Sequence, residues 1–340
     1  MTNEVSLQKY IFNEIQQRLG KRADQVETLA DILKIGKDAV YRRMRGDTIL
    51  TPDEIALLAQ HFNISLDTFT FQKANSVMFT FNPFTHIVKS FDDYLSDIQS
   101  DLAVVSKIPS AHVFYASAEI PIFYYMFFPE LIHFKFYVWG RTIWNFEYLQ
   151  NKPFDFEIIP YPVYKQVETV LNLYRSLHTT ELWSMNIMDS TLSQVEYHVS
   201  IGGFKNPKDA VTICKRLHEL ADHMQSMAQH GRKFILGSNS SSEGGTFNLY
   251  HNEMIYTNNT ILVDTPFGKS VYATHTNPNF LKTSDERMCE YTDGWFKHVL
   301  AKSTSISHQG ERGRKWYFDR LKRRIELVKT RIESQLAEEI

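Results

Sequence analysis

The chain has 340 residues, of which 43% are hydrophobic and 14% aromatic, so two or three folded domains are expected and a disordered protein is excluded. Its formal net charge of −2 excludes a protein that is basic as a whole, so any contact with nucleic acid must depend on a local patch. Cys214 and Cys289 lie far apart, which argues against a disulfide framework and favours a reducing cytoplasm; the first residues show no export signal.

The first 70 residues predict five short helices. Apolar residues recur at every fourth position between residues 7 and 19, which indicates an amphipathic helix. Two further helices are expected over 24–33 and 37–45, joined by a short turn. The run Thr51-Pro52-Asp53-Glu54 then indicates a helix start, with a hydroxyl cap, a proline at the first position and an acid at the third. A last short helix is expected over 65–69.

The helix expected over 37–45 has two chemically different sides. Val40 and Met44 lie four residues apart and are predicted to face the core. The opposite side carries Lys37, Asp38, Tyr41, Arg42 and Arg45. Arg and Lys reach guanine edges and phosphates, Asp accepts from cytosine, and Tyr donates to phosphate, so this side has the chemistry of a major-groove reader. The alternative is an ordinary helical hairpin with a solvated charged face.

Residues 29–46 resemble the Cro/C1-type (XRE-like) helix-turn-helix of phage and bacterial repressors, and the match has no gaps. The resemblance implies a lambda-repressor-like domain of five helices in which Lys37 and Asp38 open the recognition helix and face the bases. It implies further that Tyr41 and Arg42 continue along the groove and that Arg45 approaches the DNA backbone.

Four neighbouring positions complete this prediction. Arg43 is counted with the DNA-contacting cations because it lies in the same helix. Lys21 and Arg22 precede the second helix and could either contact phosphate or remain solvated loop charges. The family usually has a left-handed Gly at the turn position that Lys34 occupies here, and a Lys in that conformation costs roughly 1 kcal/mol.

Composition changes place the domain boundaries. We expect a helix-turn-helix domain over 1–72 and a linker with a connecting helix over 73–110, where apolar residues recur at helical spacing from Phe91 to Val105. The remaining residues, 111–340, are expected to form a body for dimerisation or effector sensing.

The stretch 113–148 is unusually aromatic, with twelve Phe, Tyr and Trp residues between Phe123 and Tyr148. A membrane span is excluded because charged residues and prolines interrupt the stretch well before the roughly 20 apolar residues that a span requires. The rings either form the core of the body or line a pocket for an apolar or ring-shaped effector. The candidate pocket residues are Phe123, Tyr124, Tyr125, Trp139 and Trp144. The run from Ile120 to Trp139 also loosely resembles the body of helix-turn-helix regulators from Bacteroidetes-type bacteria, a resemblance that implies no particular ligand.

The rest of the body predicts helices over 162–230 and a small antiparallel sheet over about 234–276, where turn signals separate short apolar runs. His218 and His223 are five residues apart and therefore point away from each other, which argues against a zinc site. The low-complexity segment 237–245 lacks the Lys-Ser/Thr ending of a phosphate-binding loop.

The C-terminal helix carries a possible seam. Its apolar residues follow a 3-4-3-4 spacing at coiled-coil positions: Phe318, Leu321, Ile325, Val328 and Ile332. One interpretation is a helix packed on its own domain with a basic, solvated outer face. The others are dimerisation through this seam and a second DNA contact.

Motifs typical of an enzyme, a cofactor site or a metal site are not found in the sequence. The expected fold class is mostly α (α+β), with a helix-turn-helix domain and a larger helical domain that carries a small sheet. The expected function is a cytoplasmic, dimeric transcriptional regulator that binds double-stranded DNA and whose body serves either dimerisation or the sensing of a small-molecule effector. The alternative is a ligand-binding or enzymatic body whose helix-turn-helix serves as a protein–protein interaction module.

Overall fold

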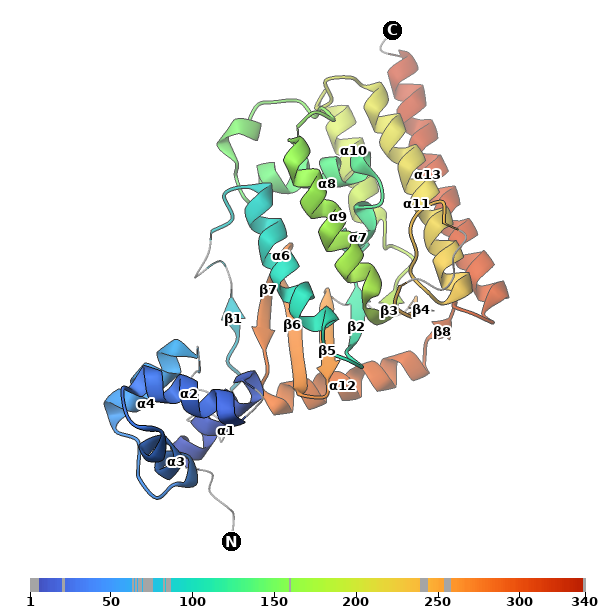
Figure 1. Cartoon of the computed structure of the whole chain (residues 1–340). Helices are drawn as coiled ribbons and strands as arrows, with labels where there is room; N and C mark the ends of the chain where they lie inside the picture. Colours follow the sequence, from blue (N-terminus) through green and yellow to red (C-terminus); the bar gives the residue numbers. More distant parts are fainter. Residues whose placement is uncertain are drawn as a thin grey trace. The chain divides into compact units, whose positions relative to one another are not determined.

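A computed structural model gives the structure of the chain. It describes residues 6–19, 22–62, 64, 66, 69, 76–81, 83, 87–158, 160–238, 244–253 and 258–338, without the side chains of residues 17, 18, 22–24 and 161. The chain divides into two compact units, which we call the head (Met1–Met78) and the body (Phe79–Ile340) (Figure 1).

The described part of the head contains four helices around one small core. They are α1 (Leu7–Leu19), α2 (Arg22–Leu33), α3 (Lys37–Arg45) and α4 (Pro52–His61). Helix α4 begins as predicted: Glu54 N donates to Thr51 Oγ1 at 3.2 Å, and Thr51 N donates to Glu54 Oε2 at 2.9 Å. The core is made of apolar side chains from all four helices and the segments between and after them: Ile11, Ile15, Val26, Leu29, Val40, Leu50, Leu58, Ala59 and Ile64. The fifth helix, predicted over 65–69, falls mainly outside the described residues.

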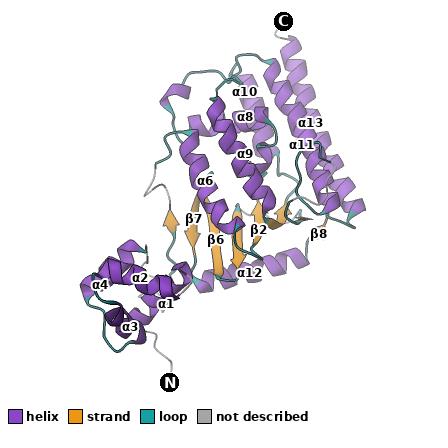
Figure 2. Cartoon of the chain, in the orientation of Figure 1, coloured by secondary structure: helices purple, strands orange, loops and turns teal. Residues whose placement is uncertain are grey.

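The body is built on an eight-stranded sheet with the order β1-β7-β6-β5-β2-β3-β4-β8 (Figure 2). The strands are β1 (Thr80–Phe81), β2 (His112–Ser117), β3 (His178–Trp183), β4 (Phe247–His251), β5 (Thr260–Thr265), β6 (Gly268–Thr276), β7 (Asn279–Thr283) and β8 (Thr304–Ser305). The central strands β2, β3 and β4 run parallel, whereas β5, β6, β7 and β1 extend the sheet on one side as antiparallel neighbours. The short β8 pairs antiparallel with β4 at the other edge.

Helices cover both faces of this sheet unequally (Figure 1). One face carries a thick layer made of α6 (Phe91–Ser106), α7 (Ile122–Tyr125), α8 (Pro129–Thr142), α9 (Tyr161–Ser176), α10 (Asp189–Ser200), α11 (Lys208–His230) and α13 (Glu311–Glu338), with the 3₁₀ turn η2 (Glu147–Leu149) after α8. The other face is covered by α12 (Glu286–Ala301), whose Cys289, Phe296 and Val299 pack against Ala116, Leu182, Leu262 and Val271 of the sheet. Successive strand residues therefore alternate between the two layers.

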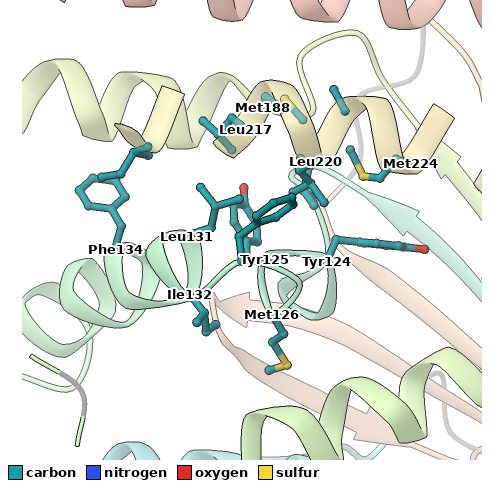
Figure 3. Close-up of a cluster of buried hydrophobic side chains, with 14 of the residues drawn as sticks. Tyr124, Tyr125, Met126, Leu131, Ile132, Phe134, Met188, Leu217, Leu220 and Met224 are labelled. Atoms are coloured by element: carbon teal, nitrogen blue, oxygen red, sulfur yellow. The ribbon is translucent and has the colours of Figure 1, made fainter. Parts of the chain in front are cut away.

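The aromatic stretch forms the core of the thick layer. Tyr124 and Tyr125 are 1% and 0% exposed, and Phe134, Phe136 and Tyr137 are fully buried in α8. Figure 3 shows Tyr125 and Leu131 directed toward Leu217 and Leu220 of α11, so these two side chains help to fill the space between α7, α8 and α11. Of the two interpretations of this stretch, core packing describes most of its residues.

The predicted fold class is wrong about the size and topology of the sheet. A small antiparallel sheet over about 234–276 was expected, and the structure has a mixed sheet of eight strands that spans residues 80–305. The parallel strands β2 and β3 were missed because strands that are covered on both faces lack the simple apolar–polar alternation of a half-exposed strand. In β3, His178-Thr-Thr-Glu-Leu-Trp183, the buried Glu181 further conceals the strand.

Helix α6, expected to connect the two domains, is part of the body. Its residues Phe91, Tyr94 and Leu95 are buried in the body core, and the helix packs beside α9. Among the described residues, no helix combines the length and the apolar character that crossing a bilayer demands.

Candidate functional site

The turn before α3 contains a residue with a left-handed backbone. Lys34 adopts φ +54°, in the left-handed region, at the position where a Gly was expected. Gly36 then caps α3 with an extended backbone, and Gly46 ends the helix at φ +85° with its N–H directed at the Arg42 and Arg43 carbonyls. Gln8 of α1 holds the C-terminal end of α3 in place, because its Nε2 donates to the carbonyls of Arg43 and Thr48 at 2.7 and 2.9 Å.

Helix α3 buries one side and exposes the other, as its spacing predicted. Val40 is fully buried and Met44 partly buried in the head core. The predicted DNA-facing residues Lys37, Asp38, Tyr41, Arg42 and Arg45 are all exposed. The structure thus brings these five side chains together on one solvent-facing side of a nine-residue helix.

Two of these cations already have acidic neighbours. Lys37 Nζ lies 3.1 Å from Glu27 Oε1, and Arg45 Nε lies 3.0 Å from Asp47 Oδ2. All four side chains are more than half exposed, so each pair is worth at most about 1 kcal/mol and yields readily to a phosphate.

Arg43 does not belong to this exposed set, although the sequence placed it there. Its side chain is only 15% exposed, and its Nη2 and Nε donate to the two Glu54 carboxylate oxygens at 2.8 and 3.1 Å. Burial alone would raise the pKa of Glu54, but hydrogen bonds from Arg43 and Thr51 outweigh that effect and hold it below its usual value. Arg43 therefore joins α3 to the start of α4 and is not available for DNA. Lys21 and the Arg22 side chain lie outside what the structure describes.

The five aromatic residues of the predicted effector pocket do not line a common pocket. Tyr124 and Tyr125 are core residues, with their hydroxyls bonded to Glu181 and Thr191. Phe123 stacks on a neighbouring tyrosine at 3.9 Å between ring centroids, and Trp144 packs against the rings of other core residues. Of the five, only Trp139 borders a cavity in the described part of the body.

This cavity, of about 750 Å³, lies at the carboxyl ends of the three parallel strands. Ser117 ends β2 and residues 118–119 follow it, residues 184–186 follow β3, and residues 252–253 follow β4. All three segments line the cavity. Helices α8 and α10 contribute Trp139 and Gln194. In open sheets with parallel strands, ligands bind at this edge because the loops that leave the strands converge there.

A buried ion pair forms part of the cavity wall. Lys135 is 1% exposed, and its Nζ lies 3.1 Å from Glu119 Oε2 and 3.4 Å from Gln194 Oε1. The same ammonium lies over the rings of Tyr125 and Trp139, at 5.3 and 5.4 Å from their centroids. Asn277 Nδ2 donates to the other oxygen of Glu119, so both carboxylate oxygens are engaged.

The last residue of β2 supplies an unsatisfied polar atom at the cavity. Ser117 is 2% exposed, and its hydroxyl has no hydrogen-bond partner among the described residues. The register places Ser117 opposite Trp183 of β3, and both residues border the cavity. Sequence analysis missed Ser117 because β2 was not recognised as a strand.

A second buried polar cluster sits inside the helix layer. Glu181 accepts hydrogen bonds from the hydroxyls of Tyr124, Tyr174 and Thr179 at 2.6, 2.8 and 3.1 Å, and from Trp183 Nε1 at 3.1 Å. Lys233 donates to Thr179 at 3.2 Å, and burial lowers the pKa of Lys233 to about 7, against the opposing attraction of Glu181. The cluster is well satisfied, so its role is to fix β3 against the helices.

Three buried histidines are held neutral. Burial lowers the pKa of His133, His198 and His223 to about 4 in each case. His223 is bonded to the Phe234 carbonyl at 3.1 Å, and His218 lies 3.3 Å from Asp222, so the two histidines have separate partners. Within the described residues, no three His, Cys, Asp or Glu side chains are grouped to hold a metal ion.

The seam of α13 lies inside the body. All five of its apolar residues are at most 3% exposed, and α13 packs along α11. Lys322 fastens the pair from the side, with Nζ at 2.7 Å from Asp222 Oδ1 and 2.8 Å from Gln225 Oε1. The interpretation of a helix packed on its own domain therefore describes the seam, and the dimer interpretation of these five residues is corrected.

Comparisons with family models, with curated proteins and with solved structures give no match in any of the three.

Proposed function

We propose that this chain is a sequence-specific DNA-binding transcriptional regulator whose head reads the major groove through α3. The observation that supports the proposal is the pairing of a buried Val40 with an opposite side that exposes Lys37, Arg42 and Arg45. Nine helical residues span roughly 13 Å, which suits a groove about 12 Å wide.

Each exposed side chain has a role that follows from its chemistry. Arg42, near the middle of α3, can pair with the O6 and N7 atoms of a guanine. Asp38, in the first turn, can accept from a cytosine amino group and would repel a misplaced phosphate. Lys37 and Arg45, at the two ends of the helix, are suited to the phosphates on either side of the groove. Two phosphate-contacting cations in each head predict a modest salt dependence, with a slope near −2 for one head.

A dimer would place two such helices in successive major grooves, about 34 Å apart. Because the α13 seam is buried within one chain, such a dimer needs a different surface. An effector would act by binding unequally to the DNA-competent and incompetent arrangements of the heads.

The alternative is that the head contacts another protein and that the body binds a small molecule or acts as an enzyme. Ile49 favours it, because this residue beside α3 is 80% exposed and apolar side chains of that kind often mark protein contacts.

Selection from a pool of random DNA duplexes with the intact chain distinguishes these functions. We expect an enriched sequence, with binding weakened at least about fivefold in Lys37→Ala and in Arg42→Ala, since each removes a contact worth about 1–3 kcal/mol. Arg323→Ala on the exposed side of α13 removes the same charge elsewhere and should bind as the parent does. No enrichment, or equal losses in all three variants, would contradict the proposal.

A further inference from the structure

We propose that the cavity at the carboxyl ends of β2, β3 and β4 binds a small neutral ring compound that carries several hydroxyl groups, of the saccharide or nucleoside class. This inference concerns the body alone and holds whether or not the head binds DNA. It replaces the predicted aromatic pocket with a different set of residues.

The position and size of the cavity suit a small ligand. Segments that leave three neighbouring parallel strands converge on it, which is the usual binding edge of such sheets. Its volume of about 750 Å³ lies within the range of small-molecule sites, and it accommodates one or two sugar rings or a nucleoside.

The charges around the cavity exclude a strongly charged ligand. The Glu119 charge is neutralised by Lys135 and its other oxygen accepts a hydrogen bond from Asn277, so Glu119 offers little attraction to a cation. The other charged residues that border the cavity are Glu253 and Arg320, one of each sign. Two carboxylates, one guanidinium and the Lys135 ammonium sum to zero, so a ligand without net charge is favoured.

The remaining polar lining matches hydroxyl groups. Serine, threonine, asparagine and glutamine side chains dominate it, among them Ser184, Asn186, Gln194 and Thr276. Such groups both donate and accept hydrogen bonds, as sugar hydroxyls do. A buried hydroxyl without a partner is unfavourable, and Ser117 Oγ is such a group, which a ligand hydroxyl would satisfy.

Partly exposed apolar side chains supply the apolar part of the site. Ile143 after α8 and Met185 after β3 border the cavity, whereas the neighbouring Trp139 and Trp183 are 4% and 0% exposed and present almost no surface to it. Apolar side chains contact the C–H faces of a sugar ring or a nucleobase, while the amides and hydroxyls around them take up the polar edge.

The test uses the full chain without DNA and a named set of probes. Glucose, galactose, N-acetylglucosamine, maltose, adenosine and uridine are compared with glucose 6-phosphate and AMP by thermal shift and then by titration calorimetry. We expect at least one neutral probe to bind, and its phosphorylated counterpart to bind at least tenfold more weakly.

Two matched serine variants locate the site. Ser117→Ala removes a hydroxyl that has no protein partner, so the unliganded chain should be no less stable, while affinity for the bound probe should fall at least tenfold. Ser307→Ala removes a buried hydroxyl that Leu249 N donates to and that lies 3.3 Å from the Phe247 and Leu249 carbonyls. It should lower the melting temperature without changing affinity. Binding by none of the six neutral probes, tighter binding of the phosphorylated compounds, or unchanged affinity in Ser117→Ala would overturn the proposal.

Discussion

Two adjacent arginines of α3 should give opposite results on substitution, and Arg43→Met tests this most sharply. Methionine keeps an unbranched apolar stem but leaves the Glu54 carboxylate, 16% exposed, without the guanidinium that donates to both of its oxygens. An exposed ion pair is worth at most about 1 kcal/mol and breaking a buried one costs roughly 3–5 kcal/mol. The intermediate exposure of this pair, with hydrogen bonds of 2.8 and 3.1 Å, therefore gives about 2 kcal/mol.

The chain provides separate signals for the head and the body. All five tryptophans lie in the body: Trp139, Trp144, Trp183, Trp295 and Trp316. Tryptophan fluorescence during urea unfolding thus follows the body, whereas far-ultraviolet circular dichroism also detects the head helices. A loss of about 2 kcal/mol should move the head transition by roughly 1–2 M urea.

Arg42→Met is the matched control, because Arg42 is exposed and its substitution should change stability by less than about 0.5 kcal/mol. Equal head transitions in Arg43→Met and Arg42→Met would refute the structural role of Arg43.

Three other predictions concern the body. Gly140→Ala should destabilise the body by about 1–3 kcal/mol, because the new Cβ would lie 2.5 Å from a Leu149 methyl carbon. Gly294→Ala in α12 has open space and should stabilise the body by about 1 kcal/mol. Shifts of the urea midpoint in the same direction for both variants would contradict this. The three buried histidines have pKa values below the ordinary 6.5, so protons favour the unfolded chain. The contribution of these histidines to the free energy of unfolding should be fully present above about pH 6.5 and should be lost as the pH falls toward 4. A urea midpoint that stays constant between pH 6.5 and pH 4 would exclude this effect. Leu321→Asp should unfold the body equally at all protein concentrations, since the seam packs on α11; a loss that high concentration reverses would indicate contact between chains instead.

Local signals in the sequence were sufficient where one helix and its caps determine the structure. The Thr51 cap and the inward Val40 were predicted correctly, because each depends on residues within one turn. Whether Lys34 would keep the left-handed backbone of the family's Gly was not predicted, and it does. Arg43 could not be separated from Arg42 in this way. Its partner Glu54 lies eleven residues further along, and only the folded turn between α3 and α4 brings the two side chains together.

Local sequence signals were not sufficient to predict the structure of the body. The spacing of the α13 seam indicated a packed helix but not its partner, which proved to be α11 of the same chain. Strand β3 carries Glu181 at a core position, and only the four donors that surround it make a buried carboxylate acceptable there. The cavity could not be predicted from the sequence either, because its wall combines strand ends, helices and loops from distant parts of the body.

The central claim is that the exposed side of α3 contacts DNA, and site-specific photocrosslinking tests it most directly. A benzophenone amino acid replaces Tyr41 on α3 in one full-length protein and Tyr197 on α10 in another; both tyrosines are exposed, at 39% and 60%. Each protein is irradiated with a duplex enriched in the selection. We expect covalent DNA adducts from position 41 and none from position 197, whereas adducts from position 197 with none from position 41 would contradict the account.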